Sequence, residues 1–195
     1  LTAVNCDEGN KLVLAGAGSG KTRVLTYRVA KLMKDFNIRP SDILALTFTN
    51  KASREMKERI ESLLRISSQG LWFGTFHGIC RRILKIHWKE AELSERFTIL
   101  DSQDQLRLVK RIIKTNNLDE KLYDAKSIQS FINRKKDNGI RSNQTSEKDD
   151  EVYILVYKEY ESILKQTFSV DFADLILKTY ELLLNHENIL SYYVK

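Results

Sequence analysis

The stretch AGAGSGKT, from Ala15 to Thr22, constrains the fold of this sequence more than any other. Glycines let a backbone turn with positive φ and bring its N–H groups close to phosphate oxygens. At the start of a helix those N–H groups form an anion site, and the helix dipole adds to the attraction. The lysine of such a loop reaches the β- and γ-phosphates, and the hydroxyl after it binds Mg²⁺. The stretch therefore predicts a nucleotide-binding loop, with Lys21 and Thr22 at the phosphates and the metal.

The flanking residues support this interpretation. KLVLA at 11–15 is typical of a short buried strand, and a helix is expected from Lys21 to about Phe36. The pattern departs from G-x-x-x-x-G-K-[ST] only in that Ala15 replaces the first glycine. The alternative is a glycine-rich turn that carries Lys and Thr by chance, and the strand-loop-helix setting argues against it.

Two further strand–helix pairs follow. Pro40, Ser41 and Asp42 predict a turn before a strand at 43–49 (ILALTFT), and a helix with apolar residues at 52, 56, 60, 63 and 64 comes next. Thr49-Asn50 supplies its capping residues. A turn at 67–70 (SSQG) leads to a strand at 71–75 (LWFGT) and a helix through 77–86. Three strands alternating with three helices predict an α/β fold with a parallel sheet.

From about Ala91 the pattern becomes helical. FTIL at 97–100 is the last expected strand, and helices are expected at 104–115, 125–135, 150–165 and 172–185. The polar run DNGIRSNQTSEKD at 137–149 has no apolar period and predicts a mobile loop.

Composition sets wider limits. Of the 195 residues, 42% are hydrophobic and 30% charged, which permits a sizeable core. No run is apolar enough to span a bilayer and no signal peptide is evident, so a soluble chain is expected, and the absence of an initial Met suggests a fragment. The net charge of +6 permits binding to a polyanion without identifying one. Cys6 and Cys80 lack metal-site spacing and are expected to be buried, reduced thiols.

A catalytic acid is not evident. Hydrolysis of a bound nucleotide needs a carboxylate at the end of another strand, to hold Mg²⁺. The nearest match is Phe97–Asp101, but Ser102 follows Asp101 where a second acid is expected. Asp101 is better explained as a helix cap facing the N–H of Asp104. The other acids fall on helix faces, so the chain is predicted to bind a nucleotide and to lack the acid that cleaves it.

Polar and aromatic residues cluster where two predicted strands end. The first cluster is Thr47, Phe48, Thr49 and Asn50, followed by a basic helix with Lys51, Arg54, Lys57 and Arg59. Ligands of parallel sheets bind beyond the carboxyl ends of the strands. An exposed aromatic there stacks on a base, and neighbouring hydroxyls bind phosphates. Alternation also places Phe48 on one face with Leu44 and Leu46, so a place in the core is an equal alternative.

The next strand repeats the arrangement. Thr75 and His77 follow the glycine of FGTFH and precede Arg81, Arg82 and Lys85. A single histidine after a strand is more often a hydrogen-bonded structural residue than a ligand. From the residues alone, His77 therefore has both a structural and a functional interpretation.

Five stretches in this order resemble the UvrD/Rep/PcrA group of superfamily 1 DNA helicases. They are LVLAGAGSGKTRVLTYR, ILALTFTNKASREMKERI, GTFHGICRRIL, FTILDSQDQLRLVKRI and VDFADLILKTYELL. The likeness runs through nearly the whole chain and is weakest between Asn116 and Asp150. It implies an ATP-dependent motor that moves 3′ to 5′ along single-stranded DNA, with two RecA-like domains.

The resemblance also implies a domain division and a set of site residues. Residues 1–90 and 169–195 would form an incomplete RecA-like domain 1A, a P-loop NTPase fold, and 91–168 the inserted all-helical subdomain 1B. ATP would lie at Ala15, Gly16, Ala17, Gly18, Ser19, Gly20, Lys21, Thr22 and Arg23, with Mg²⁺ at Thr22. DNA would lie at Thr47, Phe48, Thr49, Asn50, Thr75 and His77. Expected partners are single-stranded DNA, junctions with duplex DNA and the second RecA-like domain, in a bacterial cytoplasm.

Two departures bear on activity. The family's adenine-reading glutamine would precede Leu1, and its acid pair and arginine fingers would follow Lys195, so no hydrolysis is expected from this chain alone. The alternatives are another P-loop NTPase such as a small-molecule kinase, a DNA-binding module without enzymatic activity, and the helicase part of a helicase-nuclease. Repair, replication restart and plasmid copying all remain open as the parent's pathway.

Overall fold

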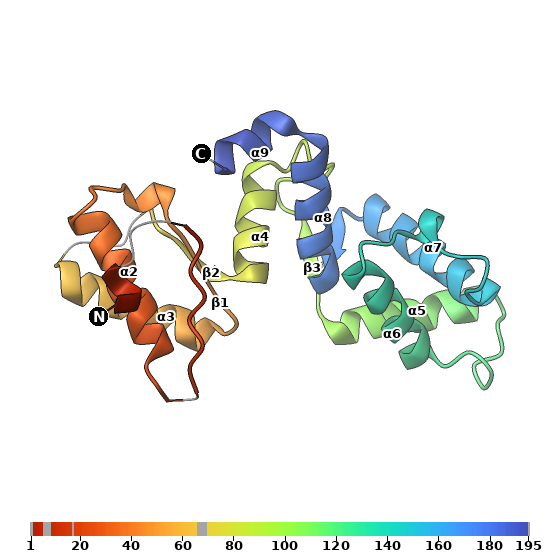
Figure 1. The fold of residues 1–195 in the computed structure, drawn as a ribbon. Helices are drawn as coiled ribbons and strands as arrows, with labels where there is room; N and C mark the ends of the chain where they lie inside the picture. The colour runs from red at the N-terminus through yellow and green to blue at the C-terminus, as the bar shows by residue number, and fades with distance from the viewer. Residues whose placement is uncertain (1, 6–8, 17, 66–69, 195) are drawn as a thin grey trace. The chain divides into compact units, whose positions relative to one another are not determined.

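A computed structural model describes residues 2–5, 9–16, 18–65 and 70–194, and the chain divides into two units, residues 1–79 and 80–195 (Figure 1). The elements in chain order are α1 (Thr2–Asn5), α2 (Lys21–Lys34), η1 (Pro40–Asp42), β1 (Leu44–Thr47), α3 (Asn50–Leu64), β2 (Trp72–Thr75), α4 (Phe76–Ile86), β3 (Thr98–Leu100), α5 (Ser102–Thr115), α6 (Ala125–Asp137), η2 (Ser142–Gln144), α7 (Glu151–Gln166), β4 (Ser169–Asp171), α8 (Phe172–Asn185) and α9 (Glu187–Tyr193). The division between the units falls inside α4.

In the first unit, β1 and β2 pair in parallel and α2 packs on α3. The register aligns Leu44 with Trp72 and Thr47 with Thr75, so the two strands end at the same level. Helix α3 begins at the predicted place, because the hydroxyl of Thr49 accepts a hydrogen bond from the N–H of Ala52 at 3.2 Å. The apolar residues that close this core are Val29, Ile43, Ala45, Met56, Ile60 and Leu71.

The prediction of a buried strand at residues 11–15 is wrong. These residues form no regular element and pair with no strand in the described part of the chain. Leu12 and Leu14 are 82% and 84% exposed. A strand is stable only when a neighbour satisfies its backbone groups and covers a face. An apolar run therefore does not by itself make one, and the sheet in this unit has two strands.

The second unit is mainly helical. Helices α5, α6 and α7 pack together around an apolar core, and Figure 1 shows them as a bundle. The core residues are Val109, Ile112, Ile113, Ala125, Ile128, Phe131, Ile132, Val156, Tyr157, Tyr160 and Leu164. Asp101 caps α5 as predicted, since its carboxylate accepts hydrogen bonds from the N–H groups of Gln103 and Asp104, each at 2.8 Å.

A strand was missed in this unit. Residues 169–171 form β4, which pairs in parallel with β3, although only helices were expected beyond 97–100. Three residues give too short a pattern for alternation to be seen. Helix α9 was not predicted either. The four helices that were predicted all occur, with ends within two residues of those expected.

The prediction of a mobile loop at 137–149 is wrong at Arg141 and Ser142, which are held by hydrogen bonds and ion pairs. Arg141 donates two hydrogen bonds to Glu181, at 2.7 and 2.6 Å, and one to Asp174 at 2.8 Å. Glu161 accepts from Arg141 at 3.1 Å and from the N–H of Ser142 at 3.0 Å. Ion pairs rather than apolar contacts organise this segment, so a search for apolar periodicity does not detect it.

The fold class is confirmed: the chain is mixed α/β, with two small parallel sheets among many helices. Within the described ranges, no helix has the length and apolar character needed to cross a membrane. Cys80 is a free thiol and half buried, and burial raises its pKa. Cys6 lies outside the described residues.

Candidate functional site

The glycine-rich loop leads directly into α2. Gly18 and Gly20 have φ values of +74° and +88°, the left-handed region that favours glycine. Gly20 is the residue before α2, and a Cβ added at Gly18 would meet nothing within 4 Å. The predicted need for glycine at these positions therefore comes from backbone conformation. Ala17 lies outside the described residues.

Lys21 folds back over the loop. Its ammonium donates hydrogen bonds to the carbonyl oxygens of Ala15 at 2.7 Å and Gly16 at 2.6 Å. Ser19 closes the same turn, because its hydroxyl donates to the Gly16 carbonyl at 2.6 Å. The loop thus holds a positive charge at its centre, next to the first N–H groups of α2, which have no acceptor within the helix. This arrangement suits an anionic ligand.

Thr22 and Arg23 are the next two residues of α2. The Thr22 side chain is half buried, and its carbonyl accepts a hydrogen bond from Thr26 at 2.8 Å. The Arg23 guanidinium lies 5.6 Å from the ring centroid of Tyr27. Arg23 and Tyr27 line a groove of about 530 Å³. The other residues that line it are Thr26, Glu58, Arg59, Ser62 and Leu63. Sequence reasoning did not single out Tyr27, although its spacing of four from Arg23 places both on one helix face.

The two predicted polar-aromatic clusters come together at the paired strand ends. Thr47 and Thr75 are the last residues of β1 and β2 and are register partners. Phe48 and Phe76 follow them directly. Asn50 begins α3, and His77 is the second residue of α4; both are exposed. The parallel register therefore brings the residues of both clusters to one edge of the sheet.

The structure separates the two interpretations of Phe48. Alternation placed Phe48 on one face with Leu44 and Leu46, of which Leu44 is exposed and Leu46 half-buried, and Phe48 itself lies just beyond the end of β1. Leu44 is 57% exposed and Phe48 91%, whereas Ala45 and Thr47 point into the core. A core position for Phe48 is therefore wrong in the described structure. The small residues of the strand face the helices that cover it.

The threonine hydroxyls at this edge have local partners. Thr47 donates to the carbonyl of Thr49 at 3.0 Å. Thr49 and Thr75 accept hydrogen bonds from the N–H groups of Ala52 and Gly78, each at 3.2 Å. A hydroxyl that accepts such a bond still carries a proton to donate. Capping and phosphate binding are therefore compatible at Thr49 and Thr75.

Phe76 was missed as a candidate. Its ring is 46% exposed, and its centroid lies 6.0 Å from that of Phe48, with the ring planes 47° apart. The signal was present as the dipeptide Thr-Phe, which occurs at the end of both strands.

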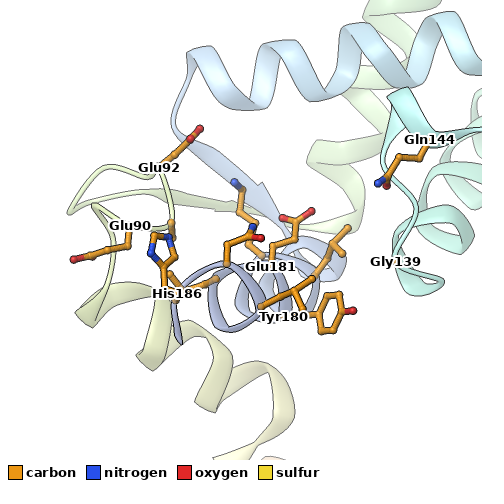
Figure 2. A pocket seen from close by; sticks show the side chains of 13 residues that line it. Glu90, Glu92, Gly139, Gln144, Tyr180, Glu181 and His186 are labelled. Carbon is orange, nitrogen blue, oxygen red and sulfur yellow. The ribbon is translucent and has the colours of Figure 1, made fainter. Parts of the chain in front are cut away.

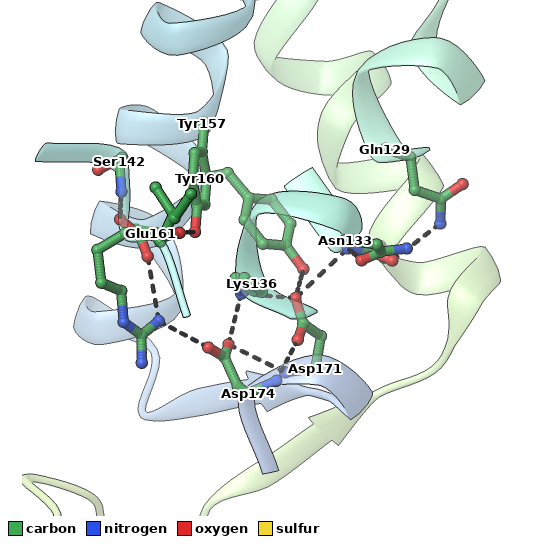
Figure 3. A network of polar contacts seen from close by, with 12 residues as sticks. Gln129, Asn133, Lys136, Ser142, Tyr157, Tyr160, Glu161, Asp171 and Asp174 are labelled. Atoms are coloured by element: carbon green, nitrogen blue, oxygen red, sulfur yellow. Dashed lines mark hydrogen bonds and ion pairs between the residues drawn. The ribbon is translucent and has the colours of Figure 1, made fainter. Parts of the chain in front are cut away.

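Asp171 and Asp174 are two buried acids of the second unit. Asp171 ends β4, so the expectation that all remaining acids lie on helix faces is wrong. Lys136 donates to Asp171 and to Asp174, each at 2.7 Å, and Tyr160 donates to Asp171 at 2.8 Å (Figure 3). Burial raises the pKa of Asp174, but Lys136 and Arg141 outweigh it and hold that pKa below its usual value. The direct bonds to buried cations identify this pair as part of a structural network.

A separate pocket of about 690 Å³ lies beside α8 in the same unit (Figure 2). Glu90, Glu92, Glu181 and Lys178 are among its lining residues, and none of the predicted site residues is. A lining with three glutamates disfavours phosphate. Among the described residues no group of three or more His, Cys, Asp or Glu is arranged to hold a metal ion.

Comparison with known proteins gives the same result as the motifs. The family model for the UvrD/REP helicase N-terminal domain matches residues 1–195. DNA helicase II of Escherichia coli (strain K12) is 47% identical over 194 residues, which is 98% of this chain and 27% of that protein. ATP-dependent DNA helicase PcrA of Bacillus subtilis (strain 168) is 43% identical over 195 residues, covering 98% of this chain and 26% of that protein. The chain thus spans about a quarter of the length of these relatives.

The match extends over the whole sequence and includes both the glycine-rich loop and the two strand ends. The resemblance stated from five stretches is therefore confirmed. This chain belongs to the UvrD/REP helicase N-terminal domain family.

Proposed function

We propose that this chain is the ATP-binding and DNA-binding N-terminal part of a helicase that moves 3′ to 5′ along single-stranded DNA. The observation that carries the proposal is the pair of register-matched strand ends, where the exposed ring of Phe48 stands beside polar residues of β1 and β2. The glycine-rich loop at α2 supports the ATP assignment. The names of the relatives, which include an ATP-dependent DNA helicase, support both.

ATP would be bound by the loop, with its β- and γ-phosphates near the Lys21 ammonium and the N–H groups at the start of α2. Thr22 would hold Mg²⁺ through its hydroxyl, and the metal would supply positive charge to the phosphates. The cation–π pair of Arg23 and Tyr27 borders the groove next to this loop. The chain alone would bind Mg·ATP without cleaving it, because the acids that hold and activate water would come from elsewhere in the protein.

DNA would lie along the strand ends. One base would stack on Phe48, and phosphates would accept hydrogen bonds from Thr49, Asn50, Thr75 and His77. Thr47 is buried and donates its hydroxyl proton to the Thr49 carbonyl, so it would support this edge rather than contact DNA. None of these contacts distinguishes one base from another, so binding would not depend on sequence. Junctions with duplex DNA are the expected substrates of the complete protein.

The domain division of the family supplies the remaining partners. Residues 1–90 and 169–195 would form domain 1A, with residues 91–168 as the inserted subdomain 1B. A second RecA-like domain would close over the nucleotide and supply arginine fingers. The proposed compartment is the bacterial cytoplasm.

The test is the affinity for a fluorescent single-stranded oligonucleotide as salt rises. Phosphate contacts release counterions, so the affinity should fall steeply with salt. Phe48→Ala in the complete protein that carries this sequence should weaken binding by about 1–3 kcal/mol, the range for one lost base stack. Fluorescence anisotropy measures both effects.

Leu44→Ala is the matched control, because Leu44 is an exposed apolar residue of β1, the strand that Phe48 follows. It should leave the affinity unchanged. Equal affinity of the Phe48→Ala variant and the parent would contradict the stacking assignment. A chain that binds Mg·ATP but shows no salt-dependent DNA binding would favour the small-molecule kinase instead.

A further inference from the structure

We infer that Phe76 is a positioning residue that holds the ring of Phe48 in place for a single stacked base. This inference rests on the proposed function, because it concerns how the same strand-end site binds DNA.

The backbone fixes Phe76 more firmly than Phe48. Phe76 is the first residue of α4, where helix formation restricts its backbone. The Thr75 hydroxyl also accepts from the Gly78 N–H and fixes the start of the same helix. Phe48 instead lies in the two-residue bend between β1 and α3. Because Thr47 and Thr75 are register partners, the less restricted ring of Phe48 lies beside the more restricted ring of Phe76.

The distance between the rings decides what they can bind. A base held between two rings needs nearly parallel planes about 6.8 Å apart, two stacking steps of about 3.4 Å each. The centroids of Phe48 and Phe76 are 6.0 Å apart and their planes are inclined by 47°. No base fits between them. The separation instead lies within the range of a favourable tilted aromatic pair.

Phe76 therefore packs against Phe48 while most of the Phe48 ring stays open to a base. Phe48 is 91% exposed, so it has few other contacts that restrict its rotamers. A neighbouring ring that favours one orientation reduces the entropy lost when a base stacks. Phe76 can improve DNA affinity by no more than the interaction energy of the Phe48–Phe76 ring pair. That energy corresponds to about a 2- to 12-fold change in affinity.

The experiment compares two oligonucleotides of equal length, one of thymidines and one with abasic sites throughout. In the complete protein, Phe76→Leu should weaken binding of the thymidine oligonucleotide about 2- to 12-fold. Binding of the abasic oligonucleotide and the salt dependence should not change, because no phosphate contact is removed. Phe76→Tyr keeps an aromatic ring at this position and should bind the thymidine oligonucleotide as tightly as the parent does. Phe76→Met gives a second variant without a ring should the leucine variant fold poorly.

The matched control is Phe36→Leu, since Phe36 is also 46% exposed and lies in the same unit. It should leave both affinities unchanged. The Phe48→Ala, Phe76→Leu double variant should bind no more weakly than Phe48→Ala alone, because Phe76 acts through Phe48.

Three results would overturn the inference. Additive losses in the double variant would mean that Phe76 contacts a base itself. Equal losses on the abasic oligonucleotide would mean a general structural defect. An unchanged affinity in Phe76→Leu, while Phe48→Ala weakens binding, would remove the positioning role and leave the proposed function intact. If Phe48→Ala itself has no effect, the proposed function fails as well.

Discussion

The Lys21 side chain is the positively charged group of the glycine-rich loop. Its ammonium is held at the carbonyl oxygens of Ala15 and Gly16, within the loop itself. A phosphate would replace these neutral acceptors with charged ones, and hydrogen bonds between charged groups are stronger. Under the proposed function, the exchange of carbonyl oxygens for phosphate oxygens is what would favour binding.

Removing that ammonium should abolish most nucleotide binding. Lys21→Ala is expected to weaken Mg·ATP binding by roughly tenfold or more, because charge-assisted hydrogen bonds to phosphate are lost. Titration of a fluorescent ATP analogue measures this, and Lys34→Ala in the last turn of α2 is the control. Phosphate release should stay at background in both variants of the 195-residue chain. Release above background that Lys21→Ala removes would reveal an unrecognised catalytic acid.

At single residues, sequence reasoning was right where local geometry determines the answer. Gly18 and Gly20 have the positive φ values that the loop pattern requires. It could not decide whether Phe48 is exposed, because alternation assigns a residue to a face and does not say which face is covered. For the same reason the apolar character of Leu12 and Leu14 did not make them buried.

At the scale of elements, helix ends were predictable because a capping residue acts within its own turn. Asp101 was expected to cap a helix, and its carboxylate accepts from two N–H groups at the start of α5. The strand β4 was not predictable, because its three residues are defined by pairing with β3, some 70 residues earlier in the chain. Long-range pairing of this kind leaves little trace in the local pattern.

Replacing the cap tests whether Asp101 is structural. Asp101→Ala should lower the stability of α5 by about 1 kcal/mol, which is typical for the loss of an N-cap. Asp101→Asn should leave the stability of α5 unchanged, since asparagine caps a helix equally well. Amide hydrogen exchange in the first turn of α5 distinguishes the two. If Asp101→Asn keeps that protection but stops ATP turnover in the complete protein, Asp101 is a catalytic acid.

At the scale of the second unit, Lys136 links α6 to the start of α8 through two buried carboxylates. Lys136→Ala should lower the free energy of unfolding by about 3–5 kcal/mol, because among the described residues it leaves the buried carboxylate of Asp171 without a cation and that of Asp174 with Arg141 alone. Faster amide exchange throughout α6 and α8 is the expected readout. Lys165→Ala is the control, because its ion pair with Glu92 is exposed and should contribute little. Unchanged protection in Lys136→Ala would mean that the network contributes nothing to stability.

The same network should make this unit sensitive to acid. The pKa of Asp174 is lower in the folded protein than its unfolded value of about 3.9. Its contribution to stability is therefore complete above about pH 4 and is lost as the pH falls through the lower, folded value. Urea unfolding between pH 6 and pH 2, followed by amide exchange in α8, should show this loss. The Asp174→Asn variant should be less stable than the parent chain at neutral pH, and its stability should change less as the pH falls.

The parallel pairing of β3 with β4 also bears on how this unit tolerates change. The N–H of Thr98 donates to the carbonyl of Phe168 at 3.3 Å, so the chain leaves for α5–α7 and returns from them at neighbouring points. The segment between them also carries Lys136 and Arg141, whose ion pairs reach β4 and α8, so a replacement segment keeps this geometry only if it supplies both cations. A chimaera that joins at these two strands should therefore fold stably only when both cations are retained.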